Sequence, residues 1–248
     1  TYGFGTERIE EFLQNNFPEV KTLRIDSDST RKKETLNEYF DEIRQGKPMI
    51  LLGTQLLAKG HHFPNVTLVG IVDADSGLFS ADFRGSERVA QLMTQVSGRA
   101  GRDKKQGRVI LQSYCTDHPQ IEEIISGSYE RFAQKLLEER KISNIPPFSF
   151  QAKIFAESPK SLVSRDFILN LLNRSRIDEK TRKNVRLVGP LPSIMEKKSG
   201  VYRWELSIFS KSRSNLHKFL DVMQSRLYDP KLSKQVRWSI DVDPLSSL

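Results

Sequence analysis

Two kinds of hydrophobic spacing alternate along the first half of the chain. In some stretches apolar residues recur every three or four positions, which predicts amphipathic helices, and between them lie short apolar runs, which predict buried strands. The first predicted helix begins at Thr6, which can cap it, and ends at Phe17-Pro18, and the second begins at Lys32 and is closed by Gly46. The predicted strands are residues 20–25, 49–52, 66–72 and 108–113. Strands that alternate with helices predict an α/β domain with a parallel sheet.

The second half of the chain follows a different order. A helical pattern runs from Ile121 to Arg140, and Ile145-Pro146-Pro147-Phe148 then breaks it, so a domain boundary is predicted there. The apolar stripe of this predicted helix consists of Ile124, Ile125, Phe132, Leu136 and Leu137. After the boundary the pattern predicts the order β-α-β-β-α-β, which is that of a ferredoxin-like split unit. The predicted elements are residues 150–156, 160–174, 186–188, 202–209, 214–227 and 236–242.

The polar positions of the stretch QLMTQVSGRAGR carry a second pattern beside its apolar helical stripe. Gln95, Arg99 and Arg102 are spaced i, i+4 and i+7, so they project from one face if the helical turn continues. Two adjacent arginines repel each other unless an anion lies between them, and planar guanidiniums suit a phosphoryl group in transfer. The pattern therefore predicts contact with a triphosphate. The alternative is a basic helix end whose arginines cap carbonyls or pair with Asp103 and Glu87.

The composition limits the class of protein. Of 248 residues, 37% are hydrophobic and 28% are charged, which is typical of a soluble globular protein. No apolar run approaches the roughly 20 residues that span a bilayer, and the start of the chain has no signal-peptide core, so a cytoplasmic protein is expected. The net charge of +8 suits a polyanionic partner such as nucleic acid. The single cysteine, Cys115, excludes an intrachain disulfide and a cysteine-rich zinc site made by this chain.

One loop after a predicted strand has the residues of an anion-binding turn. Functional residues gather beyond the carboxyl ends of parallel strands, and the small residues of Gly53-Thr54-Gln55 let backbone amides approach an anion. The Thr54 hydroxyl and the Lys59 ammonium add donors. The alternative is an ordinary turn that Thr54 caps. The neighbouring His61-His62 has no carboxylate spaced for a shared metal ion, so these histidines are expected near DNA or a domain interface.

Asp73 and Asp75 end an apolar strand, as the magnesium-binding acids of nucleotide hydrolases do. We reject that assignment because the chain has no G-x-x-x-x-G-K-[ST] loop to hold the phosphates that such a metal would serve. The two aspartates are expected to cap their loop or to pair with Arg84 or Arg88. The aromatic residues of the following segment, SGLFSADFR, are expected to pack against a neighbouring helix rather than to stack on bases.

Basic residues gather around the predicted hairpin of the second half. Lys197, Lys198 and Arg203 are close in sequence to Tyr202 and Trp204, and basic side chains interleaved with aromatic ones suit single strands or forked DNA. The alternative is a solvated face with Trp204 in the core, which is the position expected for both tryptophans.

Three motifs carry a resemblance to a known family. The pattern Q-x-x-G-R-x-G-R resembles motif VI of superfamily 2 helicases, in which such arginines act as fingers on the γ-phosphate. The segments GTQLLAKGHHFP, FSADFR and QVSGRAGR, in this order and spacing, resemble the primosomal replication-restart helicases, and the likeness extends over essentially the whole chain. It implies a RecA-like second helicase lobe at residues 1–115, a helical linker at 116–148 and a carboxyl-terminal α+β domain at 149–248 that binds DNA and partners.

The resemblance also implies roles for individual residues. Arg99 and Arg102 would be arginine fingers that work with Gln95, and Gly60 would join the two arginines in binding ATP. The motif V loop would contact DNA through Gly53, Thr54, Gln55, Lys59 and His61. Arg213, in a helix start of the form S-R-x-x-L, would bind the acidic tail of the single-stranded-DNA-binding protein.

For the whole protein the resemblance implies an ATP-dependent 3′-to-5′ DNA helicase, an ATP hydrolase, that recognises stalled or forked DNA and initiates primosome assembly for replication restart. Its first lobe would bind most of the ATP and Mg²⁺, and a zinc insert would precede Thr1, so this chain is expected to hold no metal and to be inactive alone. Expected partners are forked and single-stranded DNA and other primosome proteins. We expect a monomer in the bacterial cytoplasm, associated with the nucleoid and not with a membrane. The alternatives are a non-catalytic DNA-binding and partner-docking module and an RNA-directed motor.

Overall fold

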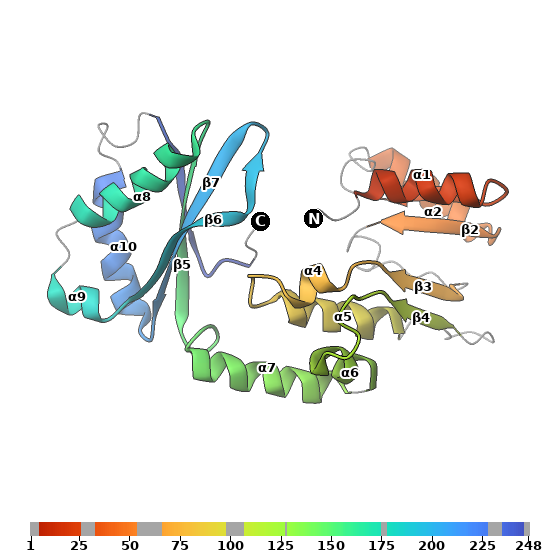
Figure 1. Cartoon of the computed structure of the whole chain (residues 1–248), viewed down its shortest axis with the longest axis horizontal. Coiled ribbons are helices and arrows are strands. Elements are labelled where there is room, and N and C mark those ends of the chain that lie inside the picture. Colours follow the sequence, from red (N-terminus) through yellow and green to blue (C-terminus); the bar gives the residue numbers. More distant parts are fainter. Residues whose placement is uncertain are drawn as a thin grey trace. The chain divides into compact units, whose positions relative to one another are not determined.

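The computed structural model describes residues 5–25, 33–53, 66–97, 107–126, 128–174, 178–227 and 235–245. The chain divides into two compact units, Thr1–Ala133 and Gln134–Leu248. This division falls before Ile145-Pro146-Pro147-Phe148, where the sequence predicts the domain boundary, and within the segment 116–148 that the resemblance implies is a linker. Figure 1 shows the helices and strands of both units. None of the described helices is both long and apolar enough to cross a membrane.

The strands of the first unit form two parallel pairs (Figure 1). β1 (Lys21–Ile25) pairs with β2 (Met49–Gly53), and β3 (Leu68–Ile71) pairs with β4 (Arg108–Leu111). All four strands lie where the sequence predicts them, and both pairings are parallel as expected. Within the described part of the chain each pair is a sheet of its own.

Helices separate these strands in sequence, as the alternating pattern predicts. They are α1 (Thr6–Asn16), α2 (Lys33–Arg44), α4 (Asp75–Leu78), α5 (Gly85–Ser97) and α6 (Pro119–Ser126). Gly5 occupies the N-cap position of α1 and no side chain caps this helix, so the prediction that Thr6 caps it is wrong. The prediction that Gly46 closes α2 is confirmed, because Gly46 has a φ of 71°, a conformation that favours glycine.

Two glycines allow α4 and α5 to pack closely. A Cβ on Gly85 would lie 2.2 Å from the carbonyl oxygen of Gly77, and a Cβ on Gly77 would lie 2.4 Å from Cγ2 of Val89. Val89 also belongs to a buried cluster that consists of Ala74, Leu78, Val89 and Ile121. The direction in which α5 leaves this cluster therefore depends on the absence of side chains at two positions.

The helix predicted over residues 121–140 is interrupted. α7 (Tyr129–Ser143) follows α6 after a short break, and the hydroxyl of Ser128 accepts a hydrogen bond from an amide in its first turn. α7 crosses the boundary between the two units. Ile125 is 63% exposed and Leu137 is 42% exposed, so the prediction of one apolar stripe that includes both residues is wrong.

The second unit is built on a four-stranded antiparallel sheet with the strand order β6-β7-β5-β8. The order along the chain is the predicted one, with one additional short helix, α9. The elements are β5 (Phe150–Ser158), α8 (Ser161–Arg174), α9 (Glu179–Lys183), β6 (Arg186–Lys198), β7 (Val201–Ser210), α10 (Arg213–Leu227) and β8 (Arg237–Val242). β6 is longer than predicted, because it continues through Gly189-Pro190 with shifts of register.

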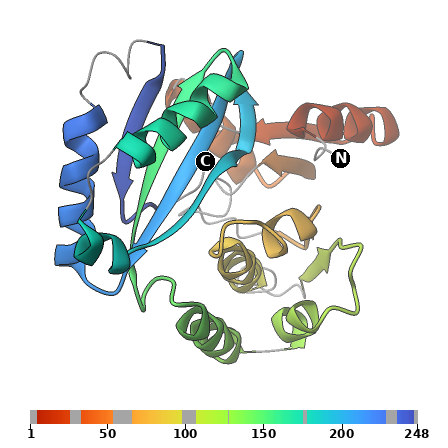
Figure 2. The ribbon, with the colours of Figure 1, turned by 60° about the vertical axis from the view of Figure 1, so that its left-hand side comes forward.

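Helices α8 and α10 cover one face of this sheet, as Figures 1 and 2 both show. The space between these helices and the sheet is filled by fully buried side chains, including Ile154, Leu206 and Phe219. Trp204 and Trp238 pack against this core, which confirms their predicted position. Each fully buried large apolar side chain contributes about 1.5–3 kcal/mol, so this core fixes the sheet that carries the basic residues of the second unit.

Candidate functional site

Helix α5 leads directly to the arginine segment. Val89, Met93 and Val96 are buried on one side of it, as the apolar stripe predicts. Gln95 is half-buried and lies on the last turns of this helix. The helix ends at Ser97, immediately before the segment that contains both arginines. Arg99 and Arg102 themselves lie outside the described residues.

The strand that precedes the predicted anion-binding turn is present. β2 ends at Gly53, so this residue lies at the carboxyl end of a parallel strand, where the sequence analysis expects functional residues. The remaining predicted members of this loop, which are Thr54, Gln55, Lys59, Gly60 and His61, lie outside the described residues.

Asp73 and Asp75 tie the end of β3 to its surroundings. Asp73 has a φ of 56° and accepts hydrogen bonds from the backbone amide of Ser76, at 3.2 Å, and from its hydroxyl. Asp75 accepts the hydroxyl of Ser113 at 2.6 Å and the amide of Tyr114 at 2.7 Å. The hydrogen bonds from Ser113 and Tyr114 hold the pKa of Asp75 below its ordinary value. The prediction that these aspartates cap their loop is confirmed for Asp73, whereas Asp75 instead accepts hydrogen bonds from the loop after β4.

Asp82 is an organising residue that the sequence analysis missed. It is 5% exposed, its Oδ1 accepts the amide of Arg84 at 3.1 Å, and its Oδ2 lies 2.9 Å from Nη2 of Arg88. Arg88 therefore pairs with Asp82 and not with either of the aspartates after β3. The signal in the sequence is an aspartate just before a helix that carries an arginine in its first turns.

The aromatic residues of the same segment pack as expected. The ring of Phe79 lies edge-on to His118, with a centroid distance of 4.9 Å and an interplanar angle of 78°. The Arg84 guanidinium lies 4.3 Å from the centroid of the Phe83 ring. Phe79 nevertheless stays 46% exposed, so its contact with His118 covers only part of the ring.

The hairpin between β6 and β7 presents two lysines. Its turn consists of Ser199, with φ 50°, and Gly200, with φ 83°, and positive φ at both positions is typical of a type I′ hairpin turn. Lys197 and Lys198 precede the turn and are exposed, and neither has a carboxylate partner among the described residues. The Lys197 ammonium lies 4.8 Å from the centroid of the Tyr202 ring. These lysines are therefore free to meet a phosphate backbone.

Arg203 has a different environment from that expected of a DNA-binding cation. Its side chain is only 14% exposed and its Nε lies 2.9 Å from Oε1 of Glu157, the residue directly opposite it on β5. Lys153 and Glu205 form a second buried pair at 2.7 Å on the same sheet. The expectation of a free cation at Arg203 is wrong, because a cross-strand carboxylate neutralises it and joins β5 to β7.

Arg213 is the first residue of α10 and is 55% exposed. Its Nη2 lies 3.0 Å from Oδ2 of Asp243, and its guanidinium lies 4.7 Å from the centroid of the Phe150 ring. An exposed ion pair of this kind contributes about 1 kcal/mol or less, so an incoming carboxylate can replace Asp243 at little cost. The ring of Phe150 meanwhile keeps the guanidinium in place.

The described residues offer no ready metal site. No group of three or more His, Cys, Asp or Glu side chains among them could hold a metal ion. Asp75 is held by hydrogen bonds from Ser113 and Tyr114, one to each carboxylate oxygen, and this ties it to the loop after β4. We therefore derive no step through a metal ion held by the described part of this chain.

Comparison with known families matches this arrangement over both units. Residues 3–104 match the helicase conserved C-terminal domain, and residues 141–245 match the primosomal protein N C-terminal domain. The first match covers most of the α/β unit, and the second covers most of the antiparallel unit.

Individual relatives extend the likeness over nearly the whole chain. The replication restart protein PriA of Haemophilus influenzae is 45% identical over 245 residues, which are 98% of this chain and 33% of that protein. PriA of Rickettsia conorii is 38% identical over 98% of this chain and 36% of its own length, and PriA of Bacillus subtilis is 35% identical over 98% and 30%. The chain belongs to the PriA family, and it spans about a third of the length of these relatives.

Proposed function

We propose that the chain forms the second motor lobe and the carboxyl-terminal domain of an ATP-dependent 3′-to-5′ DNA helicase that recognises stalled or forked DNA and starts primosome assembly for replication restart. The observation that carries this proposal is the paired family match, helicase domain followed by primosomal domain, in one chain. We class the first unit as RecA-like. We class the second as ferredoxin-like, because its strand order β6-β7-β5-β8 corresponds to the second, third, first and fourth strands of a split β-α-β-β-α-β unit.

In this proposal Arg99 and Arg102 are arginine fingers. They would contact the γ-phosphate of an ATP molecule that, together with its Mg²⁺ ion, is bound mainly by a first lobe. Gly60 would approach the same nucleotide. The position of Gln95 supports the assignment, because this half-buried residue lies on the helix that leads to both arginines. Planar guanidiniums neutralise the charge that spreads over the phosphoryl oxygens in the transition state. Alone, the chain should not hydrolyse ATP.

The proposed DNA contacts lie in both domains. In the motor lobe they are Gly53, Thr54, Gln55, Lys59 and His61. In the second domain we retain Lys197 and Lys198, whose ammonium groups are exposed beside the hairpin turn. Arg203 is assigned to the sheet, because Glu157 already neutralises it.

Partner binding is assigned to the start of α10. The guanidinium of Arg213 is exposed and its pair with Asp243 is weak, which suits exchange for a carboxylate from the acidic tail of the single-stranded-DNA-binding protein. We further propose a monomer that works with other primosome proteins in the bacterial cytoplasm, at the nucleoid. Zinc would belong to a part of the full-length protein other than this chain.

The Arg99→Lys variant of the full-length protein tests the motor assignment. Lysine keeps the charge but loses the bidentate fork, so DNA-stimulated ATP hydrolysis should fall at least a hundredfold while DNA binding stays close to that of the unchanged protein. Arg108→Lys is the control, because Arg108 is an exposed arginine on β4 of the same unit, and it should leave both measurements unchanged. An equal loss of hydrolysis and DNA binding in Arg99→Lys would refute the finger assignment.

A second candidate function is a non-catalytic module that binds DNA and docks partners. The exposed Lys197, Lys198 and Arg213 favour it, because their surfaces are complete within the second unit and need no nucleotide. Adding the remaining amino-terminal part of a full-length relative back to this chain separates the two functions. Recovery of DNA-stimulated ATP hydrolysis supports the motor, and its absence with DNA binding intact supports the module.

A further inference from the structure

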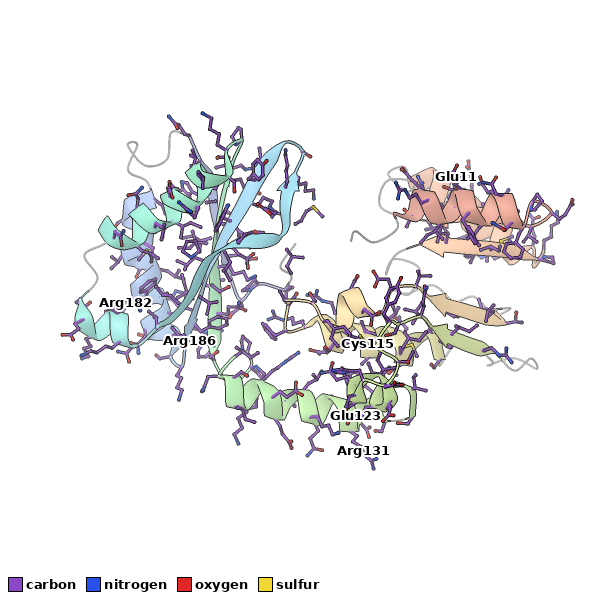
Figure 3. The ribbon with its side chains drawn as sticks, in the orientation of Figure 1. Glu11, Cys115, Glu123, Arg131, Arg182 and Arg186 are labelled. Atoms are coloured by element: carbon purple, nitrogen blue, oxygen red, sulfur yellow. The ribbon has the colours of Figure 1, made fainter. Side chains whose placement is uncertain are left out.

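The second unit contains a pocket of about 470 Å³ where β6 begins and β7 ends. Its lining comes from the end of α7, the end of α9, the first residue of β6 and the turn that leads into α10. Three of the lining residues are the cations Lys183, Arg186 and Lys211, and none of the described lining residues is acidic. Figure 3 shows Arg186 at this end of the sheet, beside α9, from which Arg182 projects.

Arg186 is fixed in place before any ligand arrives. Its Nη2 donates to the carbonyl oxygens of Ser143 and Asn144, at 3.2 Å each, and its guanidinium lies 4.5 Å from the centroid of the buried Phe209 ring. Its remaining N–H groups stay available as donors. A cation held in this way loses little conformational entropy when it binds an anion.

The two lysines are less constrained. Lys211 has no partner within the described part of the chain. Lys183 pairs with Glu179 at 2.6 Å, but the two side chains are 73% and 81% exposed, so this pair contributes little and can open toward a ligand. The pocket therefore has one rigid and two movable positive charges.

Hydrogen bonds among its own polar groups hold the polar lining of the pocket in place. Ser210 donates its hydroxyl to the carbonyl of Asn184 at 2.8 Å and accepts the amide of Ser212 at 3.3 Å, which holds the turn before α10. Ser212 in turn accepts the amide of Asn215 through its hydroxyl at 3.4 Å. Other amides of the first turn of this 15-residue helix have no intrahelical partner and favour negative charge near them.

We propose that this pocket binds a phosphate group of a nucleic-acid strand, with Lys183, Arg186 and Lys211 as its charged ligands. The inference rests on the proposed function, because it assumes a protein that binds DNA. A volume of about 470 Å³ accepts a phosphate with its attached sugar, whereas a bare phosphate would leave most of it empty. The pocket is separate from the hairpin lysines, because the two lie at opposite ends of the β6–β7 ladder. The pocket is at the Arg186↔Phe209 pair and the lysines are at the Lys198↔Val201 pair, roughly 26 Å away along β7.

The test uses the 248-residue chain and a fluorescein-labelled single-stranded oligonucleotide, with anisotropy measured over a series of salt concentrations. Lys183→Gln and Lys211→Gln should each weaken binding severalfold and lower the slope of log affinity against log salt by about 0.7, the value of one phosphate contact on a single strand. Lys211→Arg keeps the charge and should bind as the unchanged chain does. Lys180→Gln is the matched control, because Lys180 lies on α9 and does not line the pocket.

A second measurement separates the pocket from the function. Pyrophosphate added to the ¹⁵N-labelled chain should shift the backbone amide signals of Ser212 and Asn215, and Lys211→Gln should suppress these shifts. Oligonucleotide binding with an unchanged salt slope in both glutamine variants would overturn the pocket and leave the proposed function standing. Pyrophosphate shifts without any oligonucleotide binding would overturn the nucleic-acid source of the phosphate. Displacement of the oligonucleotide from the pocket amides by an acidic peptide, with no effect of pyrophosphate, would overturn the phosphate chemistry itself.

Discussion

Replacement of Gly85 by alanine should loosen the helix that leads to the arginine segment. The added Cβ would lie 2.2 Å from the carbonyl oxygen of Gly77 and 2.8 Å from Cβ of Ser80, and the first of these is a backbone atom that cannot rotate away. Relief of the first contact requires α4 and α5 to separate by about 1 Å, and overpacking of this kind typically costs about 1–3 kcal/mol. Alanine regains at most about 1 kcal/mol of helix propensity, and less at a helix start. We therefore expect a net loss of about 2 kcal/mol.

Hydrogen exchange of the backbone amides of α5 measures this loss locally. A local probe is needed because the chain has two units and a single unfolding midpoint would mix them. Amides around Met93, whose side chain is buried, should exchange about 30-fold faster in Gly85→Ala, which corresponds to about 2 kcal/mol. In the full-length protein, DNA-stimulated ATP hydrolysis should fall as well, because α5 carries Gln95.

Gly70→Ala is the control for this prediction. Gly70 lies in β3 of the same unit and a Cβ built there meets nothing within 4 Å, so the substitution should be neutral or stabilise by about 0.5–1 kcal/mol. If Gly85→Ala and Gly70→Ala leave the exchange of α5 equally slow, close packing of α4 and α5 does not position this helix.

Three further predictions follow from contacts of single side chains. Asp75→Asn should lower the thermal stability of the first unit at neutral pH, because hydrogen bonds such as that from Ser113 lower the pKa of Asp75 and favour its charged form. That contribution is present above the ordinary pKa of the carboxyl group and is lost as pH falls through the lowered pKa, so the variant should also melt with a flatter dependence on acid pH. Asp82→Ala removes the carboxylate that pairs with Arg88 and accepts the Arg84 amide, and it should cost about 1–3 kcal/mol, measured by exchange of the α5 amides, whereas an unchanged exchange rate would show that the pair is not needed. Lys197→Gln should weaken oligonucleotide binding with a salt slope lower by about 0.7, and a change in affinity without a change in slope would show that Lys197 does not contact a phosphate.

The order and type of the elements could be predicted because their hydrophobic periods are strong. β5, α8, β7 and α10 end within two residues of their predicted bounds, and the parallel pairing of the first unit follows from the alternation of strands and helices. The break between α6 and α7 was missed because apolar spacing continues across it, although Ser126-Gly127-Ser128 is a turn signal. β6 was predicted too short because its prolines argue against a central strand, yet an edge strand tolerates them, and β6 lies at the edge of the sheet.

The candidate site was predictable only where motif and chemistry coincide. The positions of Gln95 and Gly53 could be predicted because both depend on local spacing. Gln95 lies half-buried on the predicted helix, and Gly53 ends a parallel strand. The pairing of Arg203 with Glu157 depends on the register between β5 and β7, which join residues 46 positions apart. No local pattern contains that register. The same limit hides the pocket around Arg186, whose lining comes from five separate elements, α7, α9, β6, β7 and α10.

Position along a strand, rather than the number of basic residues, decides what each cation of the second unit can do. Lys153 lies on β5 in the middle of the sheet, and the carboxylate of Glu205 on the neighbouring strand β7 neutralises it. The charge of Lys153 therefore stabilises the fold and is not accessible to a ligand. Lys198 and Lys211 lie at the two ends of the β6–β7 ladder, where both are exposed and neither has a carboxylate partner among the residues that the structure describes. A nucleic-acid strand that follows this ladder would therefore meet positive charge at both ends and paired charge between them. Its affinity should depend on length, rising once an oligonucleotide is long enough to reach both ends.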